Sequence, residues 1–336
     1  MDIVRGEDGC PAFTASIRFD DAQLGFRFRW GVLLDCPAGS NHWGIVTEIK
    51  DANSVERYRE FTLQPGIQEQ HYWLAQGRRL GSQKWYPTGA DQPALRFSVW
   101  APNAQQVDVV FARFDPADES ASGYISDDGT GIDSSIGPIP LIRGDHDIWA
   151  SDPAAPKLSD WSSFFERPYM YRIKTEQGQV RYRTDLYSRS QIGRGDQNPH
   201  GGHFAGTYKE LDGVASCSMV VDADHVTAKF DDSGLSKETL VPAEEFWTDE
   251  FTHGRVPPTR IEDLVIYELH VGSLNPATLA AGTFADALAL IPYLNDLGIN
   301  TVELMPVLQF DGDLQWGYGT SHYFCLQSSA GRWKST

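Results

Sequence analysis

The hydrophobic periodicity of this chain changes near residues 253–260, and this change restricts the possible folds more than any other feature. Before it, short runs rich in Val, Ile, Phe and Tyr alternate apolar and polar residues, and Gly, Pro and Asn separate the runs. After it come an apolar run, a run with helical spacing and a second apolar run. We therefore expect β-sheet domains followed by an α/β element.

The first part of the chain has the pattern of β-sandwiches. Alternation with period two puts one face of each strand on a core and leaves the other face to water. At 336 residues the chain is long enough for several domains. We predict a β-rich N-terminal domain over residues 1–84, a β-sandwich over 85–255 and a different domain over 256–336. The runs that predict strands are residues 26–34, 42–49, 96–100, 106–111, 169–173 and 180–187.

The last domain begins with the pattern of a β-α-β unit. Residues 264–271, LVIYELHV, form a nearly continuous apolar run, which is typical of a strand buried on both faces of a parallel sheet. In residues 282–298 apolar side chains recur at spacings of three and four, which predicts a helix. Residues 299–307, INTVELMPV, predict the next strand. The connection should be right-handed and the two strands parallel.

The ends of the predicted helix carry their own signals. Thr283, followed three residues later by Asp286, is a plausible capping pair at the start. Gly298 is a plausible stop at the end. Pro292 removes one backbone donor inside the helix and is expected to kink it.

An aromatic stretch follows the second strand of this unit. Residues 314–324 read LQWGYGTSHYF and contain Trp316, Tyr318 and His322. In a β-α-β unit functional loops lie at the carboxyl ends of the strands, so the position suits ligand contact. The alternative is that these aromatic side chains pack beneath a longer loop, because aromatic residues are more often core than site.

Charge and composition exclude several classes of partner. The formal net charge is −18, which repels phosphate backbones and anionic lipid, so we expect no nucleic acid and no membrane surface as partner. No apolar run reaches the length of a membrane span, and the N-terminus is not a signal peptide. Four scattered cysteines without CxxC spacing fit reduced thiols, which predicts a cytoplasmic location.

No metal or cofactor is expected. Residues 127–137, DDGTGIDSSIG, have the wrong alternation for a calcium loop, and Pro138 stands where the bidentate glutamate would be. The HGGH of residues 200–203 has no accompanying cysteine or carboxylate cluster, so a zinc site is not supported. The sequence contains no GxGxxG, Walker or GxSxG pattern.

Two longer stretches resemble known families. Residues 95–111 and 169–188 are similar to the β-sandwich of carbohydrate-binding module family 48, which precedes the catalytic barrel in several α-glucan enzymes. Residues 265–324 resemble the opening of the (β/α)8 barrel of glycoside hydrolase family 13, the α-amylase family, on the ordered series YELHVGS, GTF, LGIN, VELMPV and WGY. The resemblance implies a multidomain β plus α/β fold, in which N-terminal β-sandwich domains precede the first β-α-β unit of an incomplete TIM barrel.

The resemblance also implies α-glucan chemistry. A glycogen branching enzyme is the leading expectation, and maltooligosyl trehalose trehalohydrolases and isoamylase-type debranching enzymes are alternatives. In the family, the tyrosine that matches Tyr318 stacks on a sugar ring beside the scissile bond, so α-glucan or a maltooligosaccharide is the expected partner. Trp316 and His322 are expected beside it as substrate-binding residues. Trp30 and Trp43 could form a second glucan platform, although core packing is the default for both.

The residues that would cleave a glycosidic bond have no matching positions. The family takes its two catalytic carboxylates from barrel strands four and five, and this chain offers two strands, so we expect no catalytic residue. Glu268 and Glu303 lie inside the apolar strands and are interpreted as polar strand residues rather than catalytic ones. Residues 325–336 begin the loop with which the family continues and then break into a basic, polar tail, which suggests a C-terminal truncation or a frame change near Gly331. A non-catalytic glucan-binding protein or an inactive fragment is therefore the alternative function.

Overall fold

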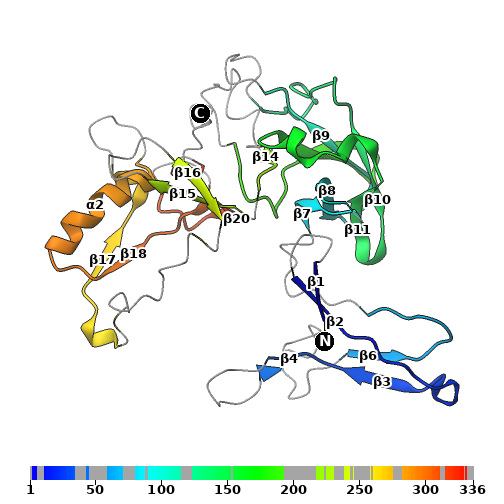
Figure 1. Ribbon diagram of the computed structural model, residues 1–336. Helices are drawn as coiled ribbons and strands as arrows, with labels where there is room; N and C mark the ends of the chain where they lie inside the picture. The colour runs from blue at the N-terminus through cyan, green and yellow to red at the C-terminus, as the bar shows by residue number, and fades with distance from the viewer. Residues whose placement is uncertain are drawn as a thin grey trace. The chain divides into compact units, whose positions relative to one another are not determined.

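In the computed structural model the chain divides into two compact units. Figure 1 labels their helices and strands. The first comprises Met1–Arg5 and Pro11–Gln76, and the second comprises Gly6–Cys10 and Gly77–Thr336. The structure describes residues 2–5, 11–34, 43–44, 59–70, 80–87, 90–114, 123–152, 154–192, 217–222, 225–230, 238–242, 245, 258, 260–274, 282–310, 315–328 and 330.

The described strands of the first unit form three antiparallel pairs. Phe19, Phe28 and Phe61 make a small aromatic cluster, in which the rings of Phe28 and Phe61 stack at 5.8 Å. The predicted strand at 26–34 appears as two short strands, and most of the predicted strand at 42–49 lies outside the described residues. The pairs are β1 (Asp2–Arg5) with β2 (Pro11–Thr14), β3 (Arg27–Trp30) with β6 (Arg59–Thr62), and β4 (Leu33–Leu34) with β5 (Trp43–Gly44).

An eight-stranded antiparallel sheet dominates the second unit. Its order is β13-β12-β9-β10-β11-β8-β7, and β14 pairs with β12. Four of the strands were predicted from their alternation, so the expected β-rich character of this part is confirmed. The two-sheet sandwich arrangement stays a prediction. The strands are β7 (Gly81–Trp85), β8 (Ala94–Trp100), β9 (Ala104–Phe111), β10 (Ile139–Arg143), β11 (Ile148–Ser151), β12 (Pro168–Thr175), β13 (Val180–Arg183) and β14 (Ser218–Met219).

This sheet curls over its own core. Three strands separate β8 from β12 in the sheet order, yet the rings of Phe97 on β8 and Tyr169 on β12 lie 4.9 Å apart. The Tyr171 hydroxyl donates to the Ser98 carbonyl at 3.3 Å across the same gap. The apolar side chains that alternate along the strands face this interior, with Val107, Val109 and Phe111 of β9, for example, all buried.

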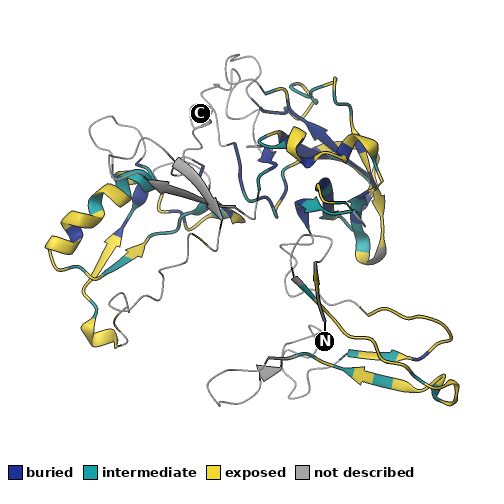
Figure 2. Ribbon diagram, viewed as in Figure 1, coloured by how far each residue is buried: buried dark blue, intermediate teal, exposed yellow. Residues whose placement is uncertain are grey.

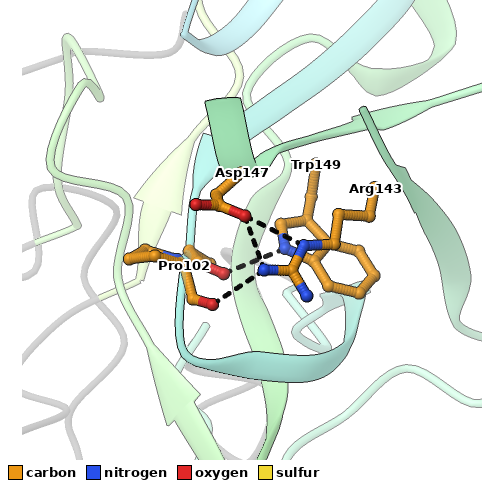
Figure 3. Close-up of polar contacts among 5 residues, drawn as sticks. Pro102, Arg143, Asp147 and Trp149 are labelled. Atoms are coloured by element: carbon orange, nitrogen blue, oxygen red, sulfur yellow. Dashed lines mark hydrogen bonds and ion pairs between the residues drawn. The ribbon is translucent and has the colours of Figure 1, made fainter. Parts of the chain in front are cut away.

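The hairpin of β10 and β11 was not predicted, and its turn is tied to a neighbouring turn (Figure 3). Arg143 donates to the Asp147 carboxylate from Nε at 3.1 Å and to the Pro102 carbonyl from Nη2 at 3.0 Å. Its guanidinium lies 5.8 Å from the Trp149 ring centroid, and the Trp149 indole N–H donates to the Ala101 carbonyl at 3.0 Å. The β8–β9 turn and the β10–β11 turn are therefore held together at one end of the sheet.

The predicted β-α-β unit is present. β17 (Ile266–Leu269) and β18 (Thr301–Leu304) are parallel, and α2 (Phe284–Asp296) connects them and lies beside both (Figure 1). The predicted capping pair is confirmed, because the Thr283 hydroxyl accepts from the Asp286 N–H while the Asp286 carboxylate accepts from the Thr283 N–H. Gly298 follows the helix in the left-handed conformation, with φ of +86°.

One expectation for this unit is wrong. The run 264–271 was expected to be buried on both faces, but Ile266 is 50% exposed and Val265 and Tyr267 are exposed too (Figure 2). In the described part of the chain β17 pairs with β18 alone, so a two-stranded sheet leaves one face uncovered. Two antiparallel pairs complete the described strands: β15 (His225–Phe230) with β16 (Glu238–Pro242), and β19 (Leu308–Phe310) with β20 (Thr320–Leu326).

Candidate functional site

The aromatic side chains of Trp316 and Tyr318 project from the segment of residues 315–319, called here the aromatic loop. Trp316 is 70% exposed and Tyr318 is 72% exposed. The loop connects β19 to β20 and reaches the end of β17, because the Gln315 carbonyl lies 2.9 Å from Nε2 of His270. His270 directly follows the last residue of β17. The structure therefore places the loop at the carboxyl end of β17, as the β-α-β pattern predicts.

Gly317 allows the loop to approach the end of β18 as well. Its φ is +83°, in the left-handed region that favours glycine, and it is buried. A Cβ added there would lie 2.5 Å from the carbonyl oxygen of Pro306, two residues beyond β18. Gly317 therefore lets the loop backbone pack on the end of β18. The residues before and after it, Trp316 and Tyr318, remain exposed.

This arrangement is suited to binding a sugar. A pyranose ring has an apolar face of C–H groups, and an exposed aromatic ring is a natural surface for it. Indole N–H and phenol O–H groups at the ring edges can add hydrogen bonds to sugar hydroxyls. The sequence predicted Trp316 and Tyr318 as neighbours at a ligand, and the structure brings them together on one exposed loop.

His322 lies apart from them, in the interior. It is the third residue of β20 and is 6% exposed. Its Nε2 lies 3.0 Å from the Thr184 hydroxyl and its Nδ1 lies 3.0 Å from the Ser321 hydroxyl. Burial lowers the pKa of His322 to about 4, so the imidazole is neutral at pH 7. The stretch WGYGTSH thus contributes two exposed aromatic residues and one buried histidine.

The other residues weighed from the sequence are distributed over both units. Glu268 and Glu303 are exposed register partners on β17 and β18. Trp30 on β3 is half-buried, and among the described residues its indole nitrogen has no hydrogen-bond partner. Trp43 lies on β5, but its side chain is outside the described residues. A glucan platform at Trp30 and Trp43 stays a prediction.

A polar pocket that sequence reasoning missed lies on β9, β12 and β13. Its volume is about 410 Å³. Arg172 pairs with Asp108 at 2.9 Å, and both line the pocket together with Lys174, Asp127 and Asp128. The alternation of polar residues along β9 and β12 was the available signal, whereas residues 127–137 were considered only as a calcium loop.

Two further observations concern metals and membranes. Among the described residues, no group of three or more His, Cys, Asp or Glu is arranged to hold a metal ion. In the same part of the chain, no helix has the length and hydrophobicity that crossing a bilayer requires.

Comparison with known proteins identifies relatives of two kinds. The malto-oligosyltrehalose trehalohydrolase of Saccharolobus solfataricus is 41% identical over 70 residues, which cover 21% of this chain and 12% of that protein. The trehalohydrolase of Mycobacterium tuberculosis (strain H37Rv) is 50% identical over 62 residues, or 18% of this chain and 10% of that protein. The 1,4-alpha-glucan branching enzyme of Oleidesulfovibrio alaskensis is 28% identical over 249 residues, or 71% of this chain and 29% of that enzyme.

The chain thus spans about a tenth to three tenths of the length of these relatives. No family model matches it. Among solved structures, a product complex of the glycogen-degrading pneumococcal virulence factor SpuA aligns with a TM-score of 0.47 and 21% identity, over 74% of this chain and 23% of that chain. The relatives confirm the resemblance found in the sequence: this chain is homologous to enzymes of glycoside hydrolase family 13, the α-amylase family.

Proposed function

We propose that this chain carries part of the substrate-binding surface of an α-glucan-active enzyme of the branching-enzyme type, and that it binds α-glucan or maltooligosaccharides through Trp316 and Tyr318. The observation that carries the proposal is the position of two exposed aromatic side chains at the carboxyl ends of two parallel strands. The contact of His270 with Gln315 and the close approach of Gly317 to Pro306 support it, because they hold the loop in place before a ligand arrives.

Electrostatics support a neutral ligand. The net charge of −18 repels anions and gives no attraction to an uncharged glucan. Binding would therefore rest on the apolar faces of the sugar rings and on hydrogen bonds rather than on charge. We expect glucan affinity to change little between low and moderate salt.

In our proposal residues 1–336 bind glucan without cleaving it. Retaining glycoside hydrolysis uses two carboxyl groups about 5–5.5 Å apart, one as nucleophile and one as acid and base. The sequence has no positions that match the family's catalytic carboxylates, and Glu268 and Glu303 lie within the strands rather than in the loops at their ends. A glucan-binding role without catalysis is therefore the function that we propose for this chain by itself.

Two finer points belong to the same proposal. The high local identity to the trehalohydrolases favours a trehalohydrolase-type parent as the second candidate, and an isoamylase-type debranching enzyme is the third. We also propose a cytoplasmic location, which the unpaired buried thiols of Cys217 and Cys325 support.

Affinity electrophoresis in gels that contain amylopectin tests the proposal, with calorimetry on maltoheptaose for the dissociation constant. We expect the chain to be retarded, and Tyr318→Ala and Trp316→Ala each to weaken binding about tenfold. Tyr293→Ala is the matched control, because Tyr293 is also an exposed tyrosine (61%) but lies near the carboxyl end of α2, away from the aromatic loop.

Enzymatic assays on the same samples separate binding from catalysis. We expect no release of reducing sugar or trehalose and no new branch points from amylose or maltooligosaccharides. A wild-type chain that migrates identically with and without amylopectin would overturn the proposal. If Tyr318→Ala and Trp316→Ala were retarded by amylopectin as strongly as the wild type, the assignment of the glucan-binding site to the aromatic loop would be overturned.

A further inference from the structure

Thr184, which is half-buried, is the centre of a polar cluster that joins the eight-stranded sheet to β20. It follows β13, and its hydroxyl lies within 3.0 Å of three side chains: Gln191 Oε1, Ser218 Oγ at 2.9 Å and His322 Nε2. Gln191, Ser218 and His322 are buried. Thr184 and His322 are 138 positions apart in the sequence, so the cluster is a tertiary connection rather than a local turn.

The hydrogen count of this cluster assigns the donors in the contacts of Ser218 and Gln191. Ser218 Oγ accepts from the Asp185 N–H at 2.9 Å and from Gln191 Nε2 at 2.8 Å, so its own proton is left for Thr184. The Thr184 proton goes to Gln191 Oε1. The remaining lone pair of Thr184 faces Nε2 of His322 at 3.0 Å, and it accepts from this nitrogen in the tautomer that carries the imidazole hydrogen on Nε2.

Other contacts accompany this hydrogen bond on both sides. The rings of Tyr187 and Phe324 stack with centroids 5.1 Å apart and an interplanar angle of 18°. Cys325 is buried, and its thiol contacts the backbone of Gln191. β20 is therefore docked on the segment 184–191 by a hydrogen bond, a ring stack and a buried thiol.

The pairing of β20 with β19 is irregular. The register shifts between Leu308 and Gln309 and again between Gln309 and Phe310. An irregular ladder of three residues fixes a strand less firmly than a regular one, so the contacts of His322 with the sheet supply a constraint that β19 does not. β20 begins at Thr320, directly after the aromatic loop.

We propose that Thr184 and His322 form a positioning pair through which the eight-stranded sheet holds the aromatic loop in its binding conformation. The inference rests on the proposed glucan site at Trp316 and Tyr318 and goes beyond it, because neither member of the pair touches the ligand. The sheet thereby contributes to glucan affinity through β20 rather than through a surface of its own.

Three variants of the full chain test this pair. Thr184→Val keeps the volume and removes the hydroxyl, whereas Thr184→Ser keeps the hydroxyl. Thr175→Val is the matched control, because Thr175 lies at the end of β12 and its hydroxyl contacts only the turn at Gln179 among the described residues. We expect Thr184→Val to weaken maltoheptaose binding about tenfold, and Thr184→Ser and Thr175→Val to bind like the wild type.

Hydrogen exchange is the second readout, and it does not depend on glucan. In Thr184→Val the amides of residues 315–326 should exchange faster while those of β8 and β9 stay protected. Faster exchange over all these segments would show general destabilisation and overturn the inference. Unchanged exchange in 315–326 would overturn it as well, even if the wild type bound no glucan and the proposed function had failed.

A single variant at His322 covers the case in which Thr184→Val folds poorly, and a double variant tests the coupling of the two residues. His322→Leu removes the hydrogen bond from the imidazole side and should also weaken maltoheptaose binding. The double variant Thr184→Val/His322→Leu should bind no more weakly than the weaker-binding single variant. Independent, additive losses would mean that the two residues do not act as a pair and would overturn the proposal.

Discussion

Glu268 and Glu303 lie directly opposite each other in the parallel pair of β17 and β18, and both are exposed. Register partners on adjacent strands share a face of the sheet, so two carboxylates are neighbours on it. Like charges directly opposite each other destabilise a strand pair. Two strands that the β-α-β topology brings together thus carry an unfavourable charge pair.

Replacing one of these carboxylates should stabilise the protein. We expect Glu303→Gln to raise the free energy of unfolding by about 0.5 kcal/mol, because the repulsion is removed and the side-chain volume is kept. Calorimetric melting at low salt measures the change, which should shrink at about 1 M NaCl. Glu176→Gln, at the exposed β12–β13 turn, is the control and should leave the melting temperature unchanged. A lower melting temperature for Glu303→Gln would show that Glu303 has a stabilising partner instead.

Gly317 and Gly319 make a matched pair within the aromatic loop. Gly317→Ala should lower the free energy of unfolding by about 1–3 kcal/mol, because φ at this position is +83° and the new Cβ would lie 2.5 Å from the Pro306 carbonyl oxygen. Gly319→Ala should be tolerated, since nothing lies within 4 Å of a Cβ there. Urea unfolding and glucan affinity of both variants check this. Equal effects at the two positions would contradict the predicted approach of the loop to β18.

Asp185 should make stability depend on pH. It is buried, and its carboxylate accepts from the hydroxyls of Tyr169 at 2.6 Å and Tyr171 at 3.1 Å and from the N–H of Tyr187 at 2.8 Å. Burial raises the pKa of Asp185 above its ordinary value of 3.8, although these hydrogen bonds oppose the shift. The folded state therefore binds this proton more tightly than the unfolded chain does. The contribution of Asp185 to the free energy of unfolding is therefore fully present below the pKa that its carboxyl has in the unfolded chain. It is lost as the pH rises through the pKa of the folded state.

The variant Asp185→Asn isolates this contribution. It should cost about 1–3 kcal/mol, because buried hydroxyls lose an acceptor, and the loss should be larger at pH 5 than at pH 8. Urea unfolding of both proteins at the two pH values gives the difference. A loss that grows toward pH 8 would mean that the folded pKa is depressed.

The thiols of Cys217 and Cys325 should resist alkylation in the folded protein. Both are buried, and burial raises the pKa of Cys325 to about 12 and that of Cys217 further still. Little thiolate forms at pH 8, and access is blocked, so iodoacetamide should label both far more slowly than in urea. Peptide mass spectrometry after timed labelling measures the two rates. Rapid labelling of Cys325 in the native state would show that β20 detaches from segment 184–191.

Local patterns were enough to predict the β-α-β unit. The helical spacing, the Thr283–Asp286 capping pair and Gly298 are signals that act within a few residues, and the structure confirms each of them. The strands β8, β9 and β12 were found for the same reason, because their short runs of β-branched and aromatic residues are local signals. The hairpin of β10 and β11 was missed. Its turn is tied to the β8–β9 turn by the hydrogen bond from Arg143 to the Pro102 carbonyl, and a contact across 41 positions leaves no local signal in the sequence.

The sequence by itself determined the resemblance to glycoside hydrolase family 13, the parallel β-α-β unit and the presence of two aromatic residues on a loop at its carboxyl end. Each of these depends on residue order and short-range periodicity. Only the tertiary structure decided that Trp316 and Tyr318 are exposed while His322, four residues beyond Tyr318, is buried against Thr184. The reason is that burial depends on what lies across from a residue, and for His322 that neighbour is 138 positions away along the chain.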